Sequence, residues 1–349
     1  MTRWKDEYML AGISLKAKRI GIDLGTANIV VWMEGRGIVY REPSIVARDI
    51  LNGQIVAVGN EAFQLLNERP GYYVSSRPLK EGVIADYETT VALIKNIIRK
   101  SAKFSFQKPY LMICVPTDIT EVEKRAVVEA ALEAGAKDAF LIDEPYAAAI
   151  GAGLPISAPA GNFIVDIGGG TTNIALISLS GIVASKAIPI AGDKMDEAIR
   201  SYIEKKYAVS ISLRVAESIK IKSGSADLKE SVYYEKQEIK GRDCKSGLPK
   251  KITVVPQDIS FAIQPALTAI VNAVISVLEQ VPPEIAADVI THGVVLTGGG
   301  ALLHDIAKVL ANKIAIPIAV SADPLDCVVT GIGENLKNIK ELRKQNNTQ

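Results

Sequence analysis

The sequence of 349 residues is poor in the residues that build disulfide frameworks and transition-metal sites. Its three cysteines, Cys114, Cys244 and Cys327, are widely spaced and form no Cys-x-x-Cys pair. Its two histidines, His292 and His304, are too few for a histidine-based metal cluster. An odd, scattered set of cysteines excludes a disulfide-stapled fold, and we expect a protein of a reducing compartment.

Strong net charge and long apolar runs are also missing. The formal net charge is +1, from 40 Lys and Arg against 39 Asp and Glu, so nothing in the overall charge indicates a nucleic-acid partner. Residues 1–18 lack the apolar core of a secretory signal, and no run of about 18 apolar residues occurs, so we expect no membrane-spanning helix. Hydrophobic residues make up 48% of the chain, which is ordinary for a globular protein of one or two domains.

The most informative stretch is residues 163–177, in which two apolar runs flank a glycine-rich turn. Asp166 stands before the turn, the glycines are Gly168, Gly169 and Gly170, and Thr171 follows them. The pattern predicts two antiparallel strands joined by a tight turn. Glycines remove every Cβ, so that backbone N–H groups can approach an anion closely, and a carboxylate at the entrance can hold hydrated Mg2+ through water. Taken alone, the stretch is equally consistent with a plain structural turn.

A second copy of this pattern occupies residues 20–32. Asp23 is followed by Gly25, Thr26, Ala27 and Asn28, again between two apolar runs. Two copies favour an internally duplicated protein with a nucleotide between its halves over two unrelated structural turns.

The rest of the chain alternates strands and helices, which predicts an α/β layered fold. Glu144 follows the strand expected at 139–142 and precedes a helix rich in Ala and Gly, which suits a connector between two lobes and places Glu144 at the cleft. Gly192 and Asp193 begin another helix whose N-terminus we expect to face the cleft. The segments 52–82 and 224–255 look like small insertions.

Two further patterns have both a structural and a functional interpretation. Glu217 and Lys220 are spaced i, i+3 on one helix face; they form either a solvated surface ion pair or a contact to ribose and base. Gly298, Gly299 and Gly300, with Ala301, join a strand to a helix, where a base or phosphate can come close to the backbone.

A possible membrane contact is the loop 103–108, in which Phe104 and Phe106 alternate with polar residues between two lysines. Such a loop can dip into a bilayer interface, or both rings can be buried under the sheet. The N-terminal leader, residues 1–18, has two interpretations: a frayed tail, or a small amphipathic helix on a membrane surface.

The whole set of motifs resembles the MreB family, the bacterial actins. It covers about residues 19–335, and its segments in order are GIDLGTAN, EPSIVA, GVIADY, DEPYAAAIGAGLP, DIGGGTTNIALIS, AGDKMDEAI and VVLTGGGALL. The wider superfamily of actins, sugar kinases and DnaK-type chaperones shares only the two hairpins, the acid at the crossing helix and the late glycine motif.

The resemblance implies an actin-like ATPase fold, α/β throughout, with two duplicated lobes around a nucleotide cleft and a small outer subdomain on each lobe. We expect the N-terminal leader in 1–18 and the inner subdomain of lobe I in 19–44, 86–154 and 325–349. The outer subdomain of lobe I is expected in 45–85. For lobe II, we expect the inner subdomain in 155–191 and 256–324 and the outer subdomain in 192–255.

The resemblance also implies ATP or ADP and Mg2+ as ligands and assigns roles to the motif residues. Gly25, Thr26, Ala27 and Asn28 hold the β- and γ-phosphates from one side, and Gly168, Gly169 and Gly170 from the other. Asp23 and Asp166 orient Mg2+, largely through water, while Glu144 polarises the attacking water with help from Thr171. Nucleoside contacts fall to Gly192, Asp193, Glu217, Lys220, Gly298, Gly299, Gly300 and Ala301. Phosphoryl transfer is mostly positioning and charge stabilisation, so this donor set suits it.

As partners, the resemblance implies copies of the same chain in head-to-tail, paired filaments, a lipid surface at the inner face of the plasma membrane, and membrane-bound morphogenetic proteins, without nucleic acid. The expected function is a slowly hydrolysing ATPase filament for cell shape, or for motility in wall-less cells. Three residues depart from the family pattern: Asn173 and Lys222 replace acids, and Asp143 replaces Glu. These departures concern the hydrolysis rate and subdomain contacts more than ATP binding.

Two other classes of the same superfamily are alternatives. A sugar or acetate kinase needs an acidic base in a substrate pocket, and the sequence shows no candidate for it beyond Glu144. A chaperone ATPase needs a peptide-binding domain, and we expect none because the sequence ends soon after the nucleotide-binding motifs. Phosphate release without any acceptor favours the filament ATPase over the kinase.

Overall fold

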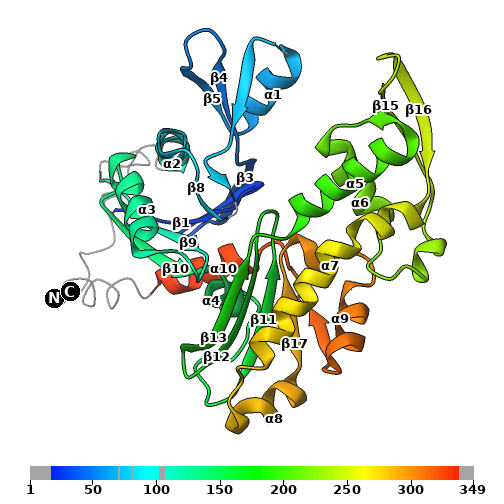
Figure 1. Ribbon diagram of the computed structural model, residues 1–349. Helices are drawn as coiled ribbons and strands as arrows, with labels where there is room; N and C mark the ends of the chain where they lie inside the picture. Colours follow the sequence, from blue (N-terminus) through cyan, green and yellow to red (C-terminus); the bar gives the residue numbers. More distant parts are fainter. Residues whose placement is uncertain (1–16, 70, 81, 102–106, 338–349) are drawn as a thin grey trace, which may run out of the picture. The chain divides into compact units, whose positions relative to one another are not determined.

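The computed structural model describes residues 17–69, 71–80, 82–101 and 107–337, and the chain divides into two compact units (Figure 1). Unit 1 comprises residues 1–147 and 328–349, and unit 2 comprises residues 148–327. The chain passes from one unit to the other within α4 (Glu144–Gly151) and within α10 (Cys327–Leu336). The predicted subdomain boundaries are finer than this division and stay a prediction.

Unit 1 contains a five-stranded mixed sheet in the order β10-β9-β1-β2-β3. The strands are β1 (Arg19–Leu24), β2 (Asn28–Met33), β3 (Gly37–Pro43), β9 (Tyr110–Val115) and β10 (Asp138–Asp143). β1 and β2 form the predicted hairpin, β2 and β3 are antiparallel, and β9 runs parallel to both β1 and β10. β9 is buried along nearly its whole length, as its continuous apolar run predicts.

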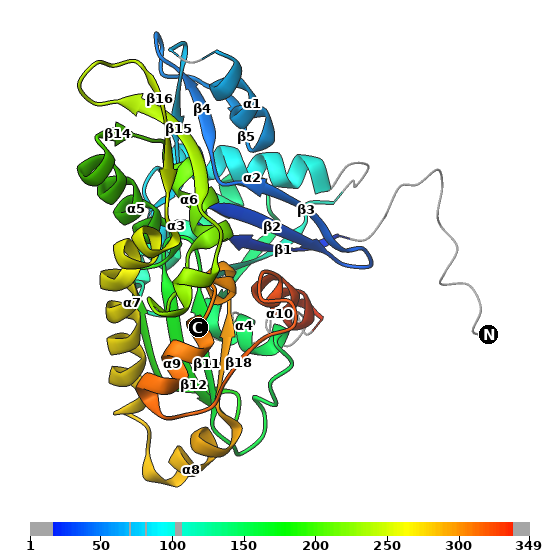
Figure 2. The ribbon, with the colours of Figure 1, turned by 90° about the vertical axis from the view of Figure 1, so that its right-hand side faces the viewer.

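Helices cover the unit 1 sheet and a smaller sheet lies beyond it. α2 (Tyr87–Ser101) buries the apolar face formed by Leu93, Ile94 and Ile97, as its periodicity predicts. α3 (Glu121–Glu133) begins with a capping box between Thr120 and Glu123. The smaller sheet consists of β4 (Val46–Asp49), β5 (Ile55–Val58) and β6 (Tyr73–Ser76), followed by the pair β7 (Leu79–Lys80) and β8 (Val83–Ile84). α1 (Asn60–Glu68) packs beside β4 and β5 (Figure 2).

Unit 2 repeats the sheet of unit 1 strand for strand, in the order β13-β12-β11-β17-β18. The strands are β11 (Asn162–Ile167), β12 (Thr172–Ser178), β13 (Gly181–Ile188), β17 (Val294–Thr297) and β18 (Ile318–Val320). The first three are antiparallel neighbours, and β17 runs parallel to β11 and β18. The same order and the same strand directions in both sheets confirm the predicted duplication.

The remaining elements of unit 2 surround this sheet. They are α5 (Gly192–Tyr207), β14 (Val209–Ser210), α6 (Leu213–Ser223), η1 (Glu230–Tyr233), β15 (Gln237–Asp243), β16 (Pro249–Val254), α7 (Pro256–Leu278), α8 (Pro283–His292), η2 (Gly299–Leu302) and α9 (Ile306–Ile314). The strands β14, β15 and β16 form a separate three-stranded sheet.

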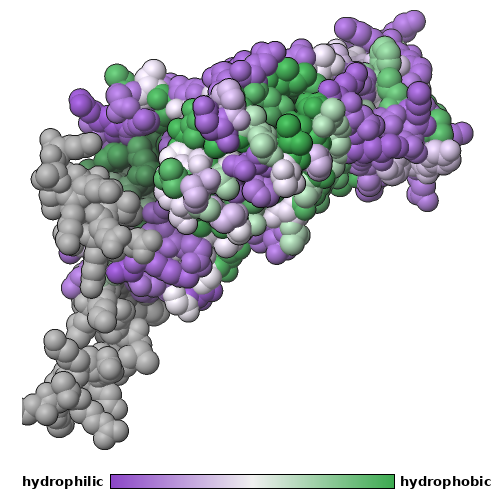
Figure 3. Space-filling model, turned by 90° about the horizontal axis from the view of Figure 1, so that it is seen from below, coloured by the Kyte–Doolittle hydropathy of each residue, from purple (hydrophilic) through white to green (hydrophobic). Residues whose placement is uncertain are grey.

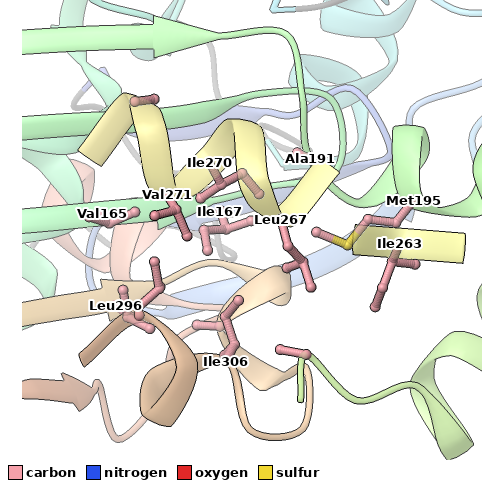
Figure 4. Packing of buried hydrophobic residues seen from close by; sticks show 14 of the residues in the cluster. Val165, Ile167, Ala191, Met195, Ile263, Leu267, Ile270, Val271, Leu296 and Ile306 are labelled. Atoms are coloured by element: carbon pink, nitrogen blue, oxygen red, sulfur yellow. The ribbon is translucent and has the colours of Figure 1, made fainter. Parts of the chain in front are cut away.

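The core of unit 2 lies between α7 and the sheet. In Figure 4, Leu267 and Ile270 of α7 lie near Ile167 of β11, and Ile263 of α7 lies beside Met195 of α5. Within the described part of the chain, α7 has the length and composition of a membrane span. The apolar composition of α7 is explained by its burial in the core of unit 2. Pro265 lies inside this helix.

Apolar side chains also reach the surface. On the face in Figure 3, hydrophobic residues form a patch bordered by hydrophilic ones. In unit 1, Leu51 and Tyr72 are exposed, and in unit 2 so are Tyr233, Leu248 and Phe261. Exposed apolar patches of this kind mark surfaces that bind partners.

Candidate functional site

Unit 1 carries one candidate phosphate-binding turn, which joins β1 to β2 and which we call hairpin 1 (residues 19–33). Asp23 pairs in register with Val30, and Leu24 with Ile29, so the turn is residues 25–28. A Cβ at Gly25 would lie 2.6 Å from the carbonyl oxygen of Asn28. The tightness of this turn therefore requires glycine at position 25, which brings backbone N–H groups to the surface.

Two acids of unit 1 meet at one edge of its sheet. β1, β9 and β10 are parallel, so Asp23, Cys114 and Glu144 lie at the carboxyl ends of three neighbouring strands, where ligands of α/β sheets bind. The thiol of Cys114 donates a hydrogen bond to Asp23 Oδ1 (3.3 Å). Burial, together with the charges of Asp23 and Glu144, raises the pKa of this thiol well above its usual value. The structure thus places the predicted magnesium-orienting acid and the predicted water-polarising acid at the ends of the strands that flank β9, each close enough to Cys114 to raise the pKa of its thiol.

The carbonyl groups of hairpin 1 are held from outside the hairpin. The N–H of Ser44, directly after β3, donates to the carbonyl oxygen of Ala27 (2.9 Å). The guanidinium of Arg77, directly after β6, donates through Nη1 to the carbonyl oxygen of Thr26 (3.1 Å). Ser44 belongs to the EPSIVA segment, for which no role was predicted, and Arg77 lies outside every motif quoted above.

Unit 2 carries its own candidate turn, which joins β11 to β12 and which we call hairpin 2 (residues 162–178). The N–H of Gly168 donates to the carbonyl oxygen of Thr171 (2.9 Å), which closes the turn. Asp166 is buried and accepts a hydrogen bond from Thr297 Oγ1 (2.7 Å). Its register partner is Asn173, whose Nδ2 donates to Thr171 Oγ1 (3.3 Å). The strand β17 therefore holds the acid, and Asn173 holds the threonine that we expect to place the attacking water.

The N-terminus of α5 supports hairpin 2. The N–H of Gly192 donates to the carbonyl oxygen of Gly168 (3.2 Å), and the N–H of Asp193 donates to that of Gly169 (2.8 Å). These helix-terminal N–H groups, which lack partners inside the helix, are thus satisfied by the hairpin. We expected both residues to face the nucleotide; in this structure their N–H groups hold the turn instead, and a direct nucleotide contact stays a prediction.

Lys220 of α6 is fixed against the same helix end. Its Nζ donates to the carbonyl oxygen of Gly192 (3.0 Å) and forms an ion pair with Asp196 Oδ1 (2.9 Å). Asp196 is buried, and burial raises its pKa to about 6, an effect that the charge of Lys220 opposes. The charges of Glu217 and Asp193 add to this rise in pKa, so four charged groups of α5 and α6 share one electrostatic environment: Asp193, Asp196, Glu217 and Lys220. A Cβ at Gly192 would lie 3.3 Å from Lys220 Nζ, so glycine leaves room for the lysine.

The late glycine motif packs against hairpin 2. Gly298 has a φ of +79°, and a Cβ there would collide with the backbone of Ile167, as would one at Gly300 with the Ile167 side chain. Ala301 is buried next to them. Close packing on the end of β11 already requires these glycines, so their contact with a base or phosphate stays a prediction.

The described residues fit magnesium bound together with a nucleotide better than a metal held by protein alone. Among them, no group of three or more His, Cys, Asp or Glu side chains is placed to hold a metal ion. Each hairpin instead offers one aspartate beside backbone donors, and Mg2+ is commonly bound by one or two carboxylates together with phosphate oxygens and water.

The structure gives supporting contacts to residues that were assigned no role from the sequence, although Ser44, Asp196 and Thr297 lie within the quoted motifs. Cys114 and Thr297 contact the two aspartates, Asp196 holds Lys220, and Ser44 and Arg77 hold hairpin 1. Phe104 and Phe106 lie outside the described residues, so the predicted membrane loop stays a prediction.

Two sheets of identical order, each with a glycine-bearing hairpin beside an aspartate, define the actin-like class of α/β proteins. The family model for the MreB/Mbl protein matches residues 17–344, and the chain therefore belongs to the MreB/Mbl family.

Individual relatives agree with this assignment. The chain is 48% identical to the cell shape-determining protein Mbl of Bacillus subtilis, over 94% of this chain and 98% of that protein. It is 45% identical to the cell shape-determining protein MreB of Escherichia coli, over 92% and 93%.

Solved structures are similar as well. The crystal structure of MreB 5 of Spiroplasma citri bound to AMPPNP has a TM-score of 0.87 and 34% identity, and covers 95% of this chain and 100% of that one. The MamK double helical filament has a TM-score of 0.78 at 22% identity, covering 93% and 99%, which shows the shared fold.

Proposed function

We propose that this protein is a bacterial actin that binds ATP with Mg2+, hydrolyses it slowly, and assembles into paired, membrane-associated filaments for cell shape or related cytoskeletal roles. The observation that carries the proposal is the pair of hairpins with the same register, each with one aspartate beside its turn. The Spiroplasma citri relatives bound to AMPPNP and to ADP support nucleotide as the ligand.

Both turns bind the phosphates of the nucleotide mainly through backbone N–H donors. Gly25, Thr26, Ala27 and Asn28 in unit 1, with Gly168, Gly169 and Gly170 in unit 2, hold the phosphates through N–H groups. Asp23 and Asp166 orient the Mg2+ ion, which neutralises charge on the phosphates when bound. Glu217, Lys220, Gly298, Gly299, Gly300 and Ala301 serve the nucleoside end.

For hydrolysis, Glu144 is the acid that polarises the attacking water, and Thr171 helps to place that water. The position of Glu144 at the carboxyl end of β10, beside Asp23 and Cys114, supports this role. The hydrogen bond from Asn173 fixes the Thr171 hydroxyl. Loss of the γ-phosphate changes what the two hairpins hold, which is the means by which hydrolysis shifts a conformational equilibrium.

For assembly, the partners are further copies of this chain and a lipid surface. The exposed apolar residues of both units support self-association, and the MamK double helical filament shows that the fold assembles in that protein. The basic residues near both termini and the Phe104–Phe106 loop motivate attachment to the inner face of the plasma membrane.

The test of the nucleotide function compares the parent chain with Glu144→Gln. Calorimetry with Mg2+ and ATP should give similar affinities, whereas phosphate release without any acceptor should fall roughly a hundredfold in the variant, because a positioned acid contributes about that factor. No ATP uptake by the parent would overturn the proposal, and phosphate release that needs a sugar or acetate acceptor would favour a kinase.

The test of assembly images the purified chain with ATP on a lipid monolayer. Filaments are expected, and soluble monomers under every nucleotide and lipid condition would contradict the filament function. Liposome co-sedimentation should fall for Phe104→Ser with Phe106→Ser, but not for Tyr72→Ser, which removes an exposed aromatic ring elsewhere on unit 1. Equal sedimentation of the double variant and its parent would remove the loop from the proposal.

A further inference from the structure

The side chain of Arg77 reaches the turn of hairpin 1 from a different part of unit 1. Arg77 is exposed and directly follows β6 of the smaller sheet, which consists of β4, β5 and β6. Its Nη1 donates a hydrogen bond to the carbonyl oxygen of Thr26 (3.1 Å). The donor is a charged group, and such hydrogen bonds are stronger than neutral ones. An arginine 51 positions away in the sequence thus holds the turn that we expect to bind phosphate.

The position of this hydrogen bond determines the direction of a backbone donor. In a planar trans peptide, the C=O and the N–H point in opposite directions. The carbonyl of Thr26 shares its peptide plane with the N–H of Ala27, so the bond from Arg77 turns the Ala27 N–H away from Arg77. In the same way, the hydrogen bond from the Ser44 N–H to the Ala27 carbonyl directs the N–H of Asn28 away from Ser44.

Hairpin 2 has the same arrangement with a different donor. Leu24 pairs with Ile29, and Ile167 pairs with Thr172, so Thr26 corresponds to Gly169. The carbonyl of Gly169 accepts its hydrogen bond from the N–H of Asp193 in the first turn of α5, at 2.8 Å. In unit 1 the strand β3 leads into β4 rather than into a helix, so no helix N-terminus follows it.

We infer that Arg77 is a positioning residue for phosphate binding: its guanidinium takes the place of a helix N-terminal N–H and holds the Thr26–Ala27 peptide with its N–H directed at the phosphates. The inference rests on the proposed ATP binding and adds to it a residue outside every phosphate motif. Arg77 acts through the peptide and not by touching the phosphate, because the carbonyl that it holds and the N–H point in opposite directions within the peptide plane.

The test measures nucleotide affinity and local backbone protection in three variants. Arg77→Met removes the donor and its charge, Arg77→Lys keeps a charge and one donor, and Arg69→Met removes an arginine near the end of α1 as a matched control for charge. We expect Arg77→Met to bind Mg·ATP and Mg·ADP about tenfold more weakly, with AMP, which lacks the β- and γ-phosphates, bound as by the parent. Arg77→Lys should recover part of the loss, and Arg69→Met should match the parent.

A second readout needs no nucleotide. Hydrogen exchange of the amides of residues 26–28 should be faster in Arg77→Met than in the parent and in Arg69→Met, with the melting temperature nearly unchanged. If the parent binds ATP and Arg77→Met binds it equally well, this inference fails while the proposed function stands. Equal losses for ATP and AMP, or for Arg77→Met and Arg69→Met, would also overturn it. If the parent binds no ATP at all, the proposed function fails, and faster exchange would still report the hydrogen bond.

Discussion

Hairpins 1 and 2 share a register but differ in what supports them. In hairpin 2, the carbonyls of Gly168 and Gly169 accept hydrogen bonds from consecutive backbone N–H groups of α5. In hairpin 1, the carbonyls of Thr26 and Ala27 accept from the side chain of Arg77 and from the N–H of Ser44. Hairpin 2 is thus held by the N-terminus of a regular helix. Hairpin 1 is held by two loop residues, one directly after β3 of the five-stranded sheet and one directly after β6 of the smaller sheet.

The difference concerns how readily each support can change. The first turn of α5 is held by the whole helix, whose residues Met195 and Ile199 are buried in the unit 2 core. The Arg77 side chain is exposed and comes from the end of β6 in the small sheet, so a shift of that sheet would withdraw the donor. Part of the support of hairpin 1 therefore comes from the small sheet of β4, β5 and β6, whereas the support of hairpin 2 comes from a helix that is packed in the unit 2 core.

The largest expected effect separates the two turns themselves. Gly25 and Gly168 occupy equivalent positions, yet a Cβ at Gly25 would lie 2.6 Å from a backbone oxygen, against 3.2 Å at Gly168. We expect Gly25→Ala to weaken ATP binding about a hundredfold and to lower stability by about 2–3 kcal/mol, because backbone must move. Gly168→Ala should cost about 1 kcal/mol, since shifts of a few tenths of an ångström relieve its contact. Calorimetry and thermal melting measure both, and equal losses would show that the turns are equally tight.

The next effect removes the helix support of hairpin 2. Gly192→Pro deletes the N–H that donates to Gly168, while proline suits the first position of a helix, which Gly192 occupies. We expect about tenfold weaker ATP binding. Gly192→Ala, which keeps the N–H, is the control for the added Cβ beside Lys220 Nζ. If both variants lose affinity equally, crowding of the lysine and not the lost donor is the cause, and the parallel with Arg77 is weakened.

The comparison also shows what sequence can predict here. The alternation of apolar runs, acids and glycines is local, so both hairpins followed from it. The duplicated sheet order followed from the repeated motif once it was recognised. These features depend on neighbours within a few residues, which a sequence displays directly.

The supports of the site are not local, and the sequence did not indicate them. Arg77 and Thr26 are brought together by the outer sheet, Cys114 and Asp23 by parallel pairing of β9 with β1, and Asp196 and Lys220 by the packing of α5 on α6. A helix N-terminus next to a motif suggested a ligand contact for Gly192 and Asp193. The competing demand, that backbone carbonyls of the hairpin also need donors, is visible only in three dimensions.

The smallest expected effect on nucleotide binding concerns a support that only hairpin 2 has, the buried pair of Asp196 and Lys220. Burial raises the pKa of Asp196 to about 6, above the ordinary value of 3.8, so the folded state keeps the proton over a pH range in which the unfolded chain has released it. The carboxyl's contribution to the free energy of unfolding should therefore fall by about 1–3 kcal/mol as pH rises from 4 to 6.

Asp196→Asn should remove this pH dependence and, because an amide oxygen still accepts from Lys220, weaken ATP binding only about threefold at pH 7. Glu197→Gln, which changes a half-exposed carboxylate paired with Lys194 on the same helix, is the control and should keep the pH dependence of the parent. Chemical denaturation at a series of pH values measures both variants. A parent whose stability instead rises between pH 4 and 6 while Asp196→Asn stays flat would mean that the charge of Lys220 outweighs burial. The ion pair would then count among the strong supports of hairpin 2 rather than the weak ones.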